Sequence, residues 1–247
     1  MINANSNTET KLQIIKLKEG LPEAAKINIK ATYYYLPTDS VIVNFSYNIK
    51  PIKKFYLDKS PFKIEIDGDE KEWGEFNYSW KLEDENSMAF YSIYYDNSFV
   101  YFGIKVIDDS IVSYGKGAAF KQDNVGFGFS PYPLNTASMS RGKNWYVNEF
   151  WQLITPQNKA VPSIYYRDMP ENAKSICVQK DYGYFSEIAV PISVIEDKKG
   201  KDWKSIRVNL AIDDNDGDGV VNRFWWQPNW MNNNVNIIGS GTFFKVQ

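Results

Sequence analysis

Two adjacent segments near the C-terminus hold the residue types best suited to binding chemistry. Residues 213–219 read DDNDGDG, and residues 224–230 read FWWQPNW. Carboxylates that alternate with small residues suit either an oxygen-coordinated cation or a tight hairpin. Tryptophans among amide side chains suit a flat polar ligand such as a sugar ring, because an indole is amphipathic.

The acidic segment is a candidate calcium loop. Asp214, Asp216 and Asp218, followed by Gly219, match the start of the D-x-D-x-D-G pattern. Three alternating carboxylates repel one another unless a cation or water screens them. However, the twelfth position is Trp225, where an EF-hand has a bidentate Glu. The segment therefore fits two readings, a plain Asp-Gly hairpin turn or a structural calcium that would order the tryptophan loop.

The composition excludes several classes of function. The chain has no histidine, which removes Ser-His and Cys-His nucleophiles, His-ligated zinc and His-ligated haem. Its net charge of −2 lacks the basic footprint of proteins that bind nucleic acid. A single cysteine, Cys177, cannot form an intrachain disulfide. No apolar run is long enough for membrane insertion. We therefore expect no haem, no nucleic acid and no membrane insertion.

The elements that would position these residues are β-strands. Apolar side chains alternate with polar or small residues at 41–47 and 124–130, and residues 99–107 form a short apolar run rich in β-branched and aromatic residues. Similar runs recur at hairpin spacing, and no long amphipathic helix is evident. The pattern predicts an all-β fold, an antiparallel β-sandwich of the jelly-roll or immunoglobulin-like kind. We expect residues 1–55 to form an N-terminal extension with two or three strands, and residues 56–247 to form the main domain.

Five landmarks, in order, resemble the family 9 carbohydrate-binding modules and the wider group of DOMON-like sandwiches. They are I-D-G at 66–68 with Trp73, F-V-Y-F at 99–102 with Asp108 and Asp109, F-K-Q-D-N-V at 120–125, G-Y-F-S-E-I-A-V-P at 183–191, and Val208-Asn209 with Asp213, Trp226, Trp230 and Gly239. The resemblance covers roughly residues 62–246. It implies a β-sandwich that binds glycans without catalysing a reaction.

The resemblance also implies a binding mode in which two aromatic rings sandwich a sugar. The first ring corresponds to Phe120 and the second to Trp230. The chain departs from the family at Gly126, where the family has an acidic residue. It departs again near Trp151, where the family has a hydrogen-bonding arginine.

Further ligand contacts are expected from residues around these rings. Trp151 and Trp226 are additional candidate platforms, and Gln152, Gln227 and Asn229 are candidate hydrogen-bonding partners. Trp225 and Trp226 should point to opposite faces if their segment is extended, so that one of the two lies in the core.

Other functions remain as alternatives to glycan binding. One is a purely structural module of a larger surface protein, whose tryptophans would be buried or lie at a contact with other domains. Another is a glycoside hydrolase or lyase using Glu187 and Glu149 as an acid and base. For the glycan-binding module we expect an extracellular or bacterial cell-surface location, with a signal sequence that is not part of these 247 residues.

Overall fold

The computed structural model describes residues 25–34, 40–49, 54–82, 87–114, 119–133, 150–158, 170–227 and 239–246. The chain divides into two compact units, Met1–Ile52 and Lys53–Gln247. The described part of the first unit is an antiparallel hairpin of β1 (Ala25–Tyr34) and β2 (Ser40–Ile49). Its alternating sequence is typical of a strand pair.

The second unit is mainly β, with one short α-helix. Its strands are β3 (Phe55–Lys59), β4 (Tyr78–Lys81), β5 (Met88–Tyr95), β6 (Phe99–Ile107), β7 (Asn124–Ser130), β8 (Phe150–Ile154), β9 (Lys174–Lys180), β10 (Gly183–Pro191), β11 (Ser205–Asp214), β12 (Asn222–Trp225) and β13 (Thr242–Lys245). The helix α1 spans Ile192–Lys199, and two 3₁₀ helices, η1 (Glu70–Trp73) and η2 (Ala119–Lys121), lie in the connections.

These strands form one continuous mixed sheet. The hydrogen-bonded order is β8-β7-β11-β13-β3-β5-β6-β10-β9, with β12 paired to β11 and β4 paired to β5. The predicted all-β fold is confirmed, but the purely antiparallel sandwich is corrected. Strand β3 lies between β13 and β5 and runs parallel to both, so it joins two otherwise antiparallel groups of strands into one sheet.

The sheet curves until its two outer strands nearly meet. Gln157, just beyond β8, bridges to Val178 in β9. The Gln157 amide donates to the Cys177 carbonyl at 3.0 Å, and the Gln179 amide donates to the Gln157 carbonyl at 2.9 Å. The second unit is therefore a nearly closed barrel, a shape that leaves few unpaired edges.

Large apolar side chains fill the interior of this barrel. The alternation of each strand sends one set of residues inward, and the rings of Phe102 and Phe127 meet edge to face with centroids 4.7 Å apart. Such aromatic pairs stabilise a core beyond their buried area. Cys177 is also buried, and burial raises the pKa of its thiol, which makes it an unreactive core residue.

A second layer covers the outer face of β6 and β10. Trp73, at the end of η1, is 1% exposed and packs against Tyr94, Phe185 and Ala189. Its Nε1 donates to Glu187 Oε1 at 2.7 Å. The N–H groups of residues 67 and 68 donate to the other oxygen of Glu187. This layer seals Trp73 and Glu187 from solvent.

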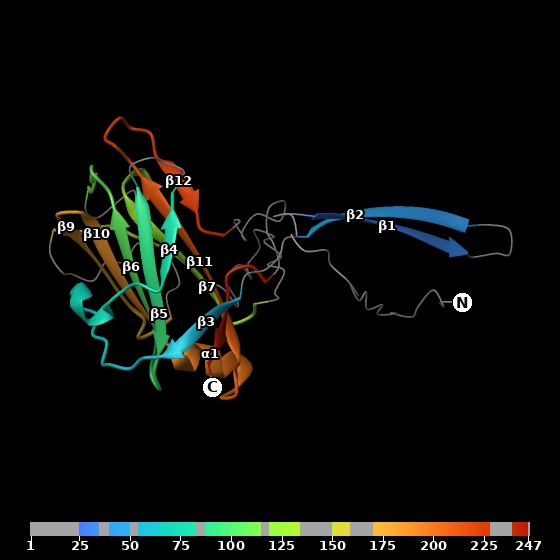
Figure 1. Ribbon diagram of the computed structural model, residues 1–247, viewed down its shortest axis with the longest axis horizontal. Helices are drawn as coiled ribbons and strands as arrows, with labels where there is room; N and C mark the ends of the chain where they lie inside the picture. The colour runs from blue at the N-terminus through green and yellow to red at the C-terminus, as the bar shows by residue number, and fades with distance from the viewer. Residues whose placement is uncertain are drawn as a thin grey trace. The chain divides into compact units, whose positions relative to one another are not determined.

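The opposite ends of the barrel differ. Figure 1 shows β12 and the turn before it at one end, and α1 at the other. Among the described residues, no helix has the length and apolar character needed to cross a membrane.

Candidate functional site

Two tryptophans lie on the outer face of strands β7, β8, β11 and β12. Gly126, Ala211 and Trp225 stand opposite one another in adjacent strands, so they share one row across this face. Trp151, from β8, lies beside that row, and its ring centroid is 5.1 Å from that of Trp225 at an interplanar angle of 36°. Glycine and alanine leave space above the sheet, and the two indoles occupy it.

Gly126 is the reason that Trp151 can lie over the sheet. A Cβ atom at position 126 would lie 2.5 Å from Cζ2 of Trp151 and 3.2 Å from the Cβ of Ala211. The first separation is well below van der Waals contact, so any larger residue would displace the indole. The chain departs from the family pattern at both Gly126 and Trp151, and the two departures depend on each other, because the Trp151 indole needs the space above Gly126.

A charged pair lies next to the two indoles. The Arg223 guanidinium, from β12, makes two hydrogen bonds to the Asp213 carboxylate, which also accepts from Asn124 Nδ2 at 2.9 Å. The Asp213 carboxylate is buried, whereas the Arg223 side chain is 35% exposed. Hydrogen bonding to Asp213 raises the pKa of Arg223, so the guanidinium is charged and still accessible to solvent.

Phe120 lies in η2, next to the same cluster of apolar residues. Its neighbour Ala119 packs with Trp151, Leu153 and Ala211, whereas the Phe120 side chain is 53% exposed. Trp151 itself is only 8% exposed and Trp225 is half-buried. An exposed aromatic ring on a segment that packs next to such indoles, together with an accessible guanidinium, is typical of a binding surface. We call Phe120, Trp151, Trp225 and Arg223 the aromatic platform.

Two of the predicted ligand contacts face the interior instead. Trp226 packs against Phe55 and Tyr91, with ring centroids 4.9 and 5.2 Å away, because successive residues of β12 and its continuation point to opposite sides. Gln152 stands opposite core residue Phe127 and is fully buried. Neither side chain lies on the platform face with Trp225.

The remaining predicted ligand residues are half-buried or outside the described part. The backbone of Gln227 exchanges hydrogen bonds with the Asn209 side chain, at 3.0 Å from its N–H and 3.1 Å to its carbonyl. Asn229 and Trp230 lie outside the described residues. Their roles stay predictions.

Sequence reasoning missed two platform residues, Trp225 and Arg223. Their spacing of two along a strand places both on one face, which was a usable signal. The alternation alone could not show whether Trp225 or Trp226 faced outward.

The acidic turn separates its three predicted cation ligands. Asp214 is buried at the end of β11, whereas Asp216 and Asp218 are exposed. Asp218 Oδ1 accepts from the Val220 amide at 2.8 Å. Within the described residues, Asp216 and Asp218 thus belong to a solvated turn, and Asp214 has different neighbours.

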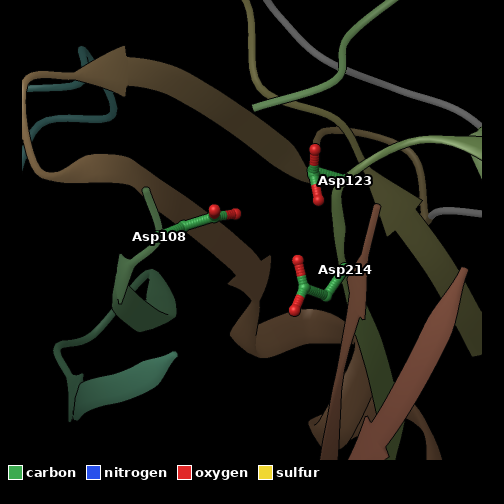
Figure 2. A group of neighbouring side chains, drawn as sticks. All are labelled: Asp108, Asp123 and Asp214. Atoms are coloured by element: carbon green, nitrogen blue, oxygen red, sulfur yellow. The ribbon is translucent and has the colours of Figure 1, made fainter. Parts of the chain in front are cut away.

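Asp214 instead meets two aspartates from distant segments. Asp108 follows β6 and Asp123 precedes β7, and one oxygen from each of the three carboxylates lies within 4.8 Å of the others. All three side chains are buried, and Figure 2 shows their carboxylates directed toward a common space. Such a group could hold a metal ion. We call it the aspartate triad.

Burial dominates the electrostatics of Asp123. Loss of solvent raises the pKa of Asp123 to about 7, and the charge of Asp108 adds to this rise. Hydrogen bonds from the amides of Val112 and Asn215 act in the opposite direction. The Asp123 carboxyl therefore keeps its proton to a higher pH than a solvated aspartate does.

The alternative acid and base pair is not assembled among the described residues. Glu187 is fully buried on β10 and accepts three hydrogen bonds beneath the second layer. Glu149 lies outside the described residues.

Comparison with solved structures identifies the fold. The chain is similar to a family 9 carbohydrate-binding module from Caldicellulosiruptor kristjanssonii in complex with cellotriose, with a TM-score of 0.56 and 14% sequence identity over 78% of this chain and 93% of that one. The same module in complex with glucose gives a TM-score of 0.56 and 14% identity, over 78% of this chain and 96% of that one. No family model and no curated protein matches the sequence.

Proposed function

We propose that this protein is a non-catalytic glycan-binding module. The observation that carries the proposal is the aromatic platform, which combines an exposed phenylalanine, a half-buried Trp225 in contact with the buried Trp151, and an accessible arginine. The fold agrees with this function, since it is shared with a module captured with cellotriose and with glucose. The same likeness to a non-catalytic module favours binding over catalysis.

The platform suits a pyranose ring for two physical reasons. The apolar C–H face of a sugar can stack on Phe120 or Trp225, which removes apolar surface from water. The Arg223 guanidinium can then donate to hydroxyl or ring oxygens at the sugar edge, because Asp213 fixes its orientation while leaving N–H groups free. Stacking supplies affinity, and the fixed donor supplies orientation.

The ligand preference should differ from that of the resembled family. The family pattern has an acidic residue and an arginine where this chain has Gly126 and Trp151. The indole of Trp151 now fills the space above Gly126, and Arg223 from β12 provides the only described guanidinium of the platform. We therefore expect a broader, more apolar contact with the sugar faces and fewer hydrogen bonds at one chain end.

Titration with cellotriose and glucose, followed by soluble plant and algal glycans, tests the proposal. Intrinsic tryptophan fluorescence and isothermal titration calorimetry would both report binding. We expect Phe120→Ala and Trp225→Ala each to weaken it roughly tenfold or more, as truncation of a central aromatic contact does.

Tyr56→Ala is the matched control for Phe120→Ala. Both side chains are 53% exposed aromatics, but Tyr56 lies on β3, away from the platform strands. The control should bind like the parent chain. Equal losses in both variants would contradict a platform at Phe120. If the parent chain binds none of the glycans tested, the structural-module alternative would be favoured.

The location follows as part of the same proposal. Polysaccharides that such a module would bind lie outside the cell, so we propose an extracellular or cell-surface location. Fractionation of the native host, followed by detection of the protein in surface and secreted fractions, would test it.

A further inference from the structure

We propose that a basic cleft at the α1 end of the barrel binds a sulfate ester of an acidic polysaccharide. The cleft has a volume of about 220 Å³ and is lined by Tyr95, Lys201, Asp202, Trp203, Lys204, Lys245 and Val246. We call it the lysine cleft. Its affinity for a sulfate group is argued from the cleft alone. The assignment of that sulfate to a glycan rests on the glycan-binding function proposed above.

The lysine cleft is separate from the aromatic platform. Lys204 follows helix α1, and Figure 1 shows α1 at the opposite end of the barrel from β12, which carries Trp225. Trp225 stands opposite Ala211 of β11, six residues along that strand from Ser205, which corresponds to about 20 Å. A single sugar ring cannot contact both places, so the cleft would be a second site.

Positive charge is concentrated at this cleft. Residues 198–204 read KKGKDWK, with four lysines and one aspartate, in a chain whose net charge is −2. Three residues of the lining are lysines, and Asp202 is the only acid among them. Within the part of the chain that the structure describes, Lys201, Lys204 and Lys245 form no ion pair. Their ammonium groups are therefore available to an anion.

Lys245 is held in place by aromatic rings rather than by a carboxylate. Its Nζ lies 4.4 Å from the ring centroid of Trp203 and 4.9 Å from that of Tyr95. Both rings are buried, and they meet edge to face with centroids 6.0 Å apart. An ammonium over aromatic faces keeps its charge and its N–H donors. It is positioned before any ligand arrives, which lowers the entropic cost of binding.

Lys204 and Lys245 occupy opposite positions on two paired segments. Ser205 of β11 stands opposite Phe244 of β13, so Lys204 and Lys245 form the next opposite pair. The Lys245 N–H donates to the Lys204 carbonyl at 2.8 Å, which fixes this arrangement. Like charges directly opposite each other destabilise a strand pair. An anion between the two ammonium groups would remove this repulsion.

The number and kind of donors favour a sulfate ester. An ammonium is a compact charge with three donors, and it lacks the planar fork with which arginine matches a carboxylate. A sulfate ester has three terminal oxygens, one for each lysine of the cleft, whereas a carboxylate has two. Val246 is 40% exposed at the cleft, where it can contact the sugar ring that carries the sulfate.

Two separate sites have a consequence for long ligands. One polysaccharide chain can place neutral rings on the aromatic platform and a sulfate group in the lysine cleft. The second contact is then intramolecular, so a long sulfated chain should bind more tightly than a short one.

Sulfate binding is tested on the full chain by calorimetric titration at low salt. The probes are dextran sulfate, unsulfated dextran, polygalacturonate and sodium sulfate. We expect dextran sulfate to bind at least tenfold more tightly than dextran, with an affinity that falls as salt is added. Equal binding of the two dextrans would overturn the proposal. Tighter binding of polygalacturonate would overturn the choice of sulfate over carboxylate. Sodium sulfate that binds as tightly as dextran sulfate, per sulfate group, would overturn the assignment to a polysaccharide.

Matched lysine variants locate the sulfate. Lys204→Gln and Lys245→Gln should each weaken dextran sulfate binding about fivefold, and Lys245→Arg should retain it, because a guanidinium keeps the charge over the rings.

Lys81→Gln is the matched control for these variants. Lys81 is exposed and has no ion pair among the described residues, but it pairs with Met88, at the other end of β5 from Tyr95. The control should bind dextran sulfate within about twofold of the parent chain. Equal losses in Lys81→Gln and Lys245→Gln would indicate unspecific attraction and overturn the cleft.

The aromatic platform separates this proposal from the proposed function. Trp225→Ala should weaken binding of cellotriose and retain binding of dextran sulfate, whereas Lys245→Gln should do the reverse. Loss of dextran sulfate binding in Trp225→Ala but not in Lys245→Gln would place the sulfate beside Arg223 and refute the cleft. If dextran sulfate binds at the lysines but the chain binds no neutral glycan, the sulfate site is supported and the proposed function fails.

Discussion

The same packing arrangement, a tryptophan laid over a glycine, occurs on two faces of the barrel. Trp73 covers Gly103 on β6, and Trp151 covers Gly126 on β7, and in each case a Cβ atom on the glycine would lie 2.5 Å from the indole. The surroundings differ. Trp73 is 1% exposed beneath the second layer and hydrogen-bonded to Glu187, whereas Trp151 is 8% exposed and lies against a half-buried Trp225.

One packing motif can therefore have a structural role on one face and a binding role on the other. An indole over a glycine buries a large apolar area wherever it occurs. What differs is the neighbour of the indole: the second layer at Trp73, and at Trp151 a half-buried Trp225 whose exposed part is available for a ligand. Variants on the two faces should therefore differ in stability, in pH dependence and in glycan affinity.

The largest expected effect is on the sealed face. Trp73→Ala should lower the free energy of unfolding by about 3–5 kcal/mol, because it leaves a cavity and removes a hydrogen bond to a buried carboxylate. Urea unfolding measures the loss. Trp225→Ala is the comparison on the open face and should cost far less, since that indole is already half-buried. Similar losses in the two variants would contradict the distinction between the faces.

The second effect concerns the pH dependence of the sealed face. Burial raises the pKa of Glu187 from 4.5 to about 7. Hydrogen bonds from Trp73 and from the amides of Gly68 and Asp67 lower this pKa, but they do not cancel the effect of burial. Because the folded state holds this proton more tightly than the unfolded state, stability should fall as pH rises from about 4.5 to 7. The loss from this group is at most about 3 kcal/mol.

Glu187→Gln isolates this contribution. The variant cannot ionise at position 187, so its unfolding free energy, measured in urea with chelator present, should lack this part of the decline with pH. An unchanged pH profile in the variant would show that Glu187 does not titrate in this range. The same change places an amide N–H₂ group among three donors, and we expect a lower stability at pH 5 as well.

The third effect compares the two glycines directly. Gly103→Ala should cost about 1–3 kcal/mol, as overpacking of a core does, because Trp73 cannot move away. Gly126→Ala should cost less, since Trp151 lies against Trp225, which is only half-buried and can shift with it. It should instead alter glycan affinity by displacing the indole. Thermal unfolding and calorimetric titration of both variants with cellotriose would check this, and the reverse ranking of stability losses would contradict it.

The smallest effect is expected at the edge of the platform. Arg223→Lys keeps a positive charge next to Asp213 but loses the two-pronged hydrogen bond. We expect a stability change of about 1 kcal/mol or less, because Arg223 is partly exposed. Glycan affinity, measured by tryptophan fluorescence, should fall more than stability does. An unchanged affinity would remove Arg223 from the binding site.

The sequence alone determined the strand content and the direction of many side chains. Short alternating runs separated by turn residues allow little other than β-structure, and the ordered landmarks predicted the fold that the structural comparison confirms. The alternation also required Trp225 and Trp226 to face opposite sides. These properties follow from local geometry, in which neighbouring residues decide the outcome.

Tertiary structure decided the rest, because it depends on which distant strands pair. Pairing of β7 with β11 sets Asn124 opposite Asp213, and it brings Asp123 to Asn215, 92 residues away. This pairing draws Asp214 into a buried triad with Asp108 and Asp123, and it leaves Asp216 and Asp218 in solvent. The same pairing turns Trp225 outward beside Trp151. No local pattern specifies such contacts, since each one depends on the register of strands that are far apart in the chain.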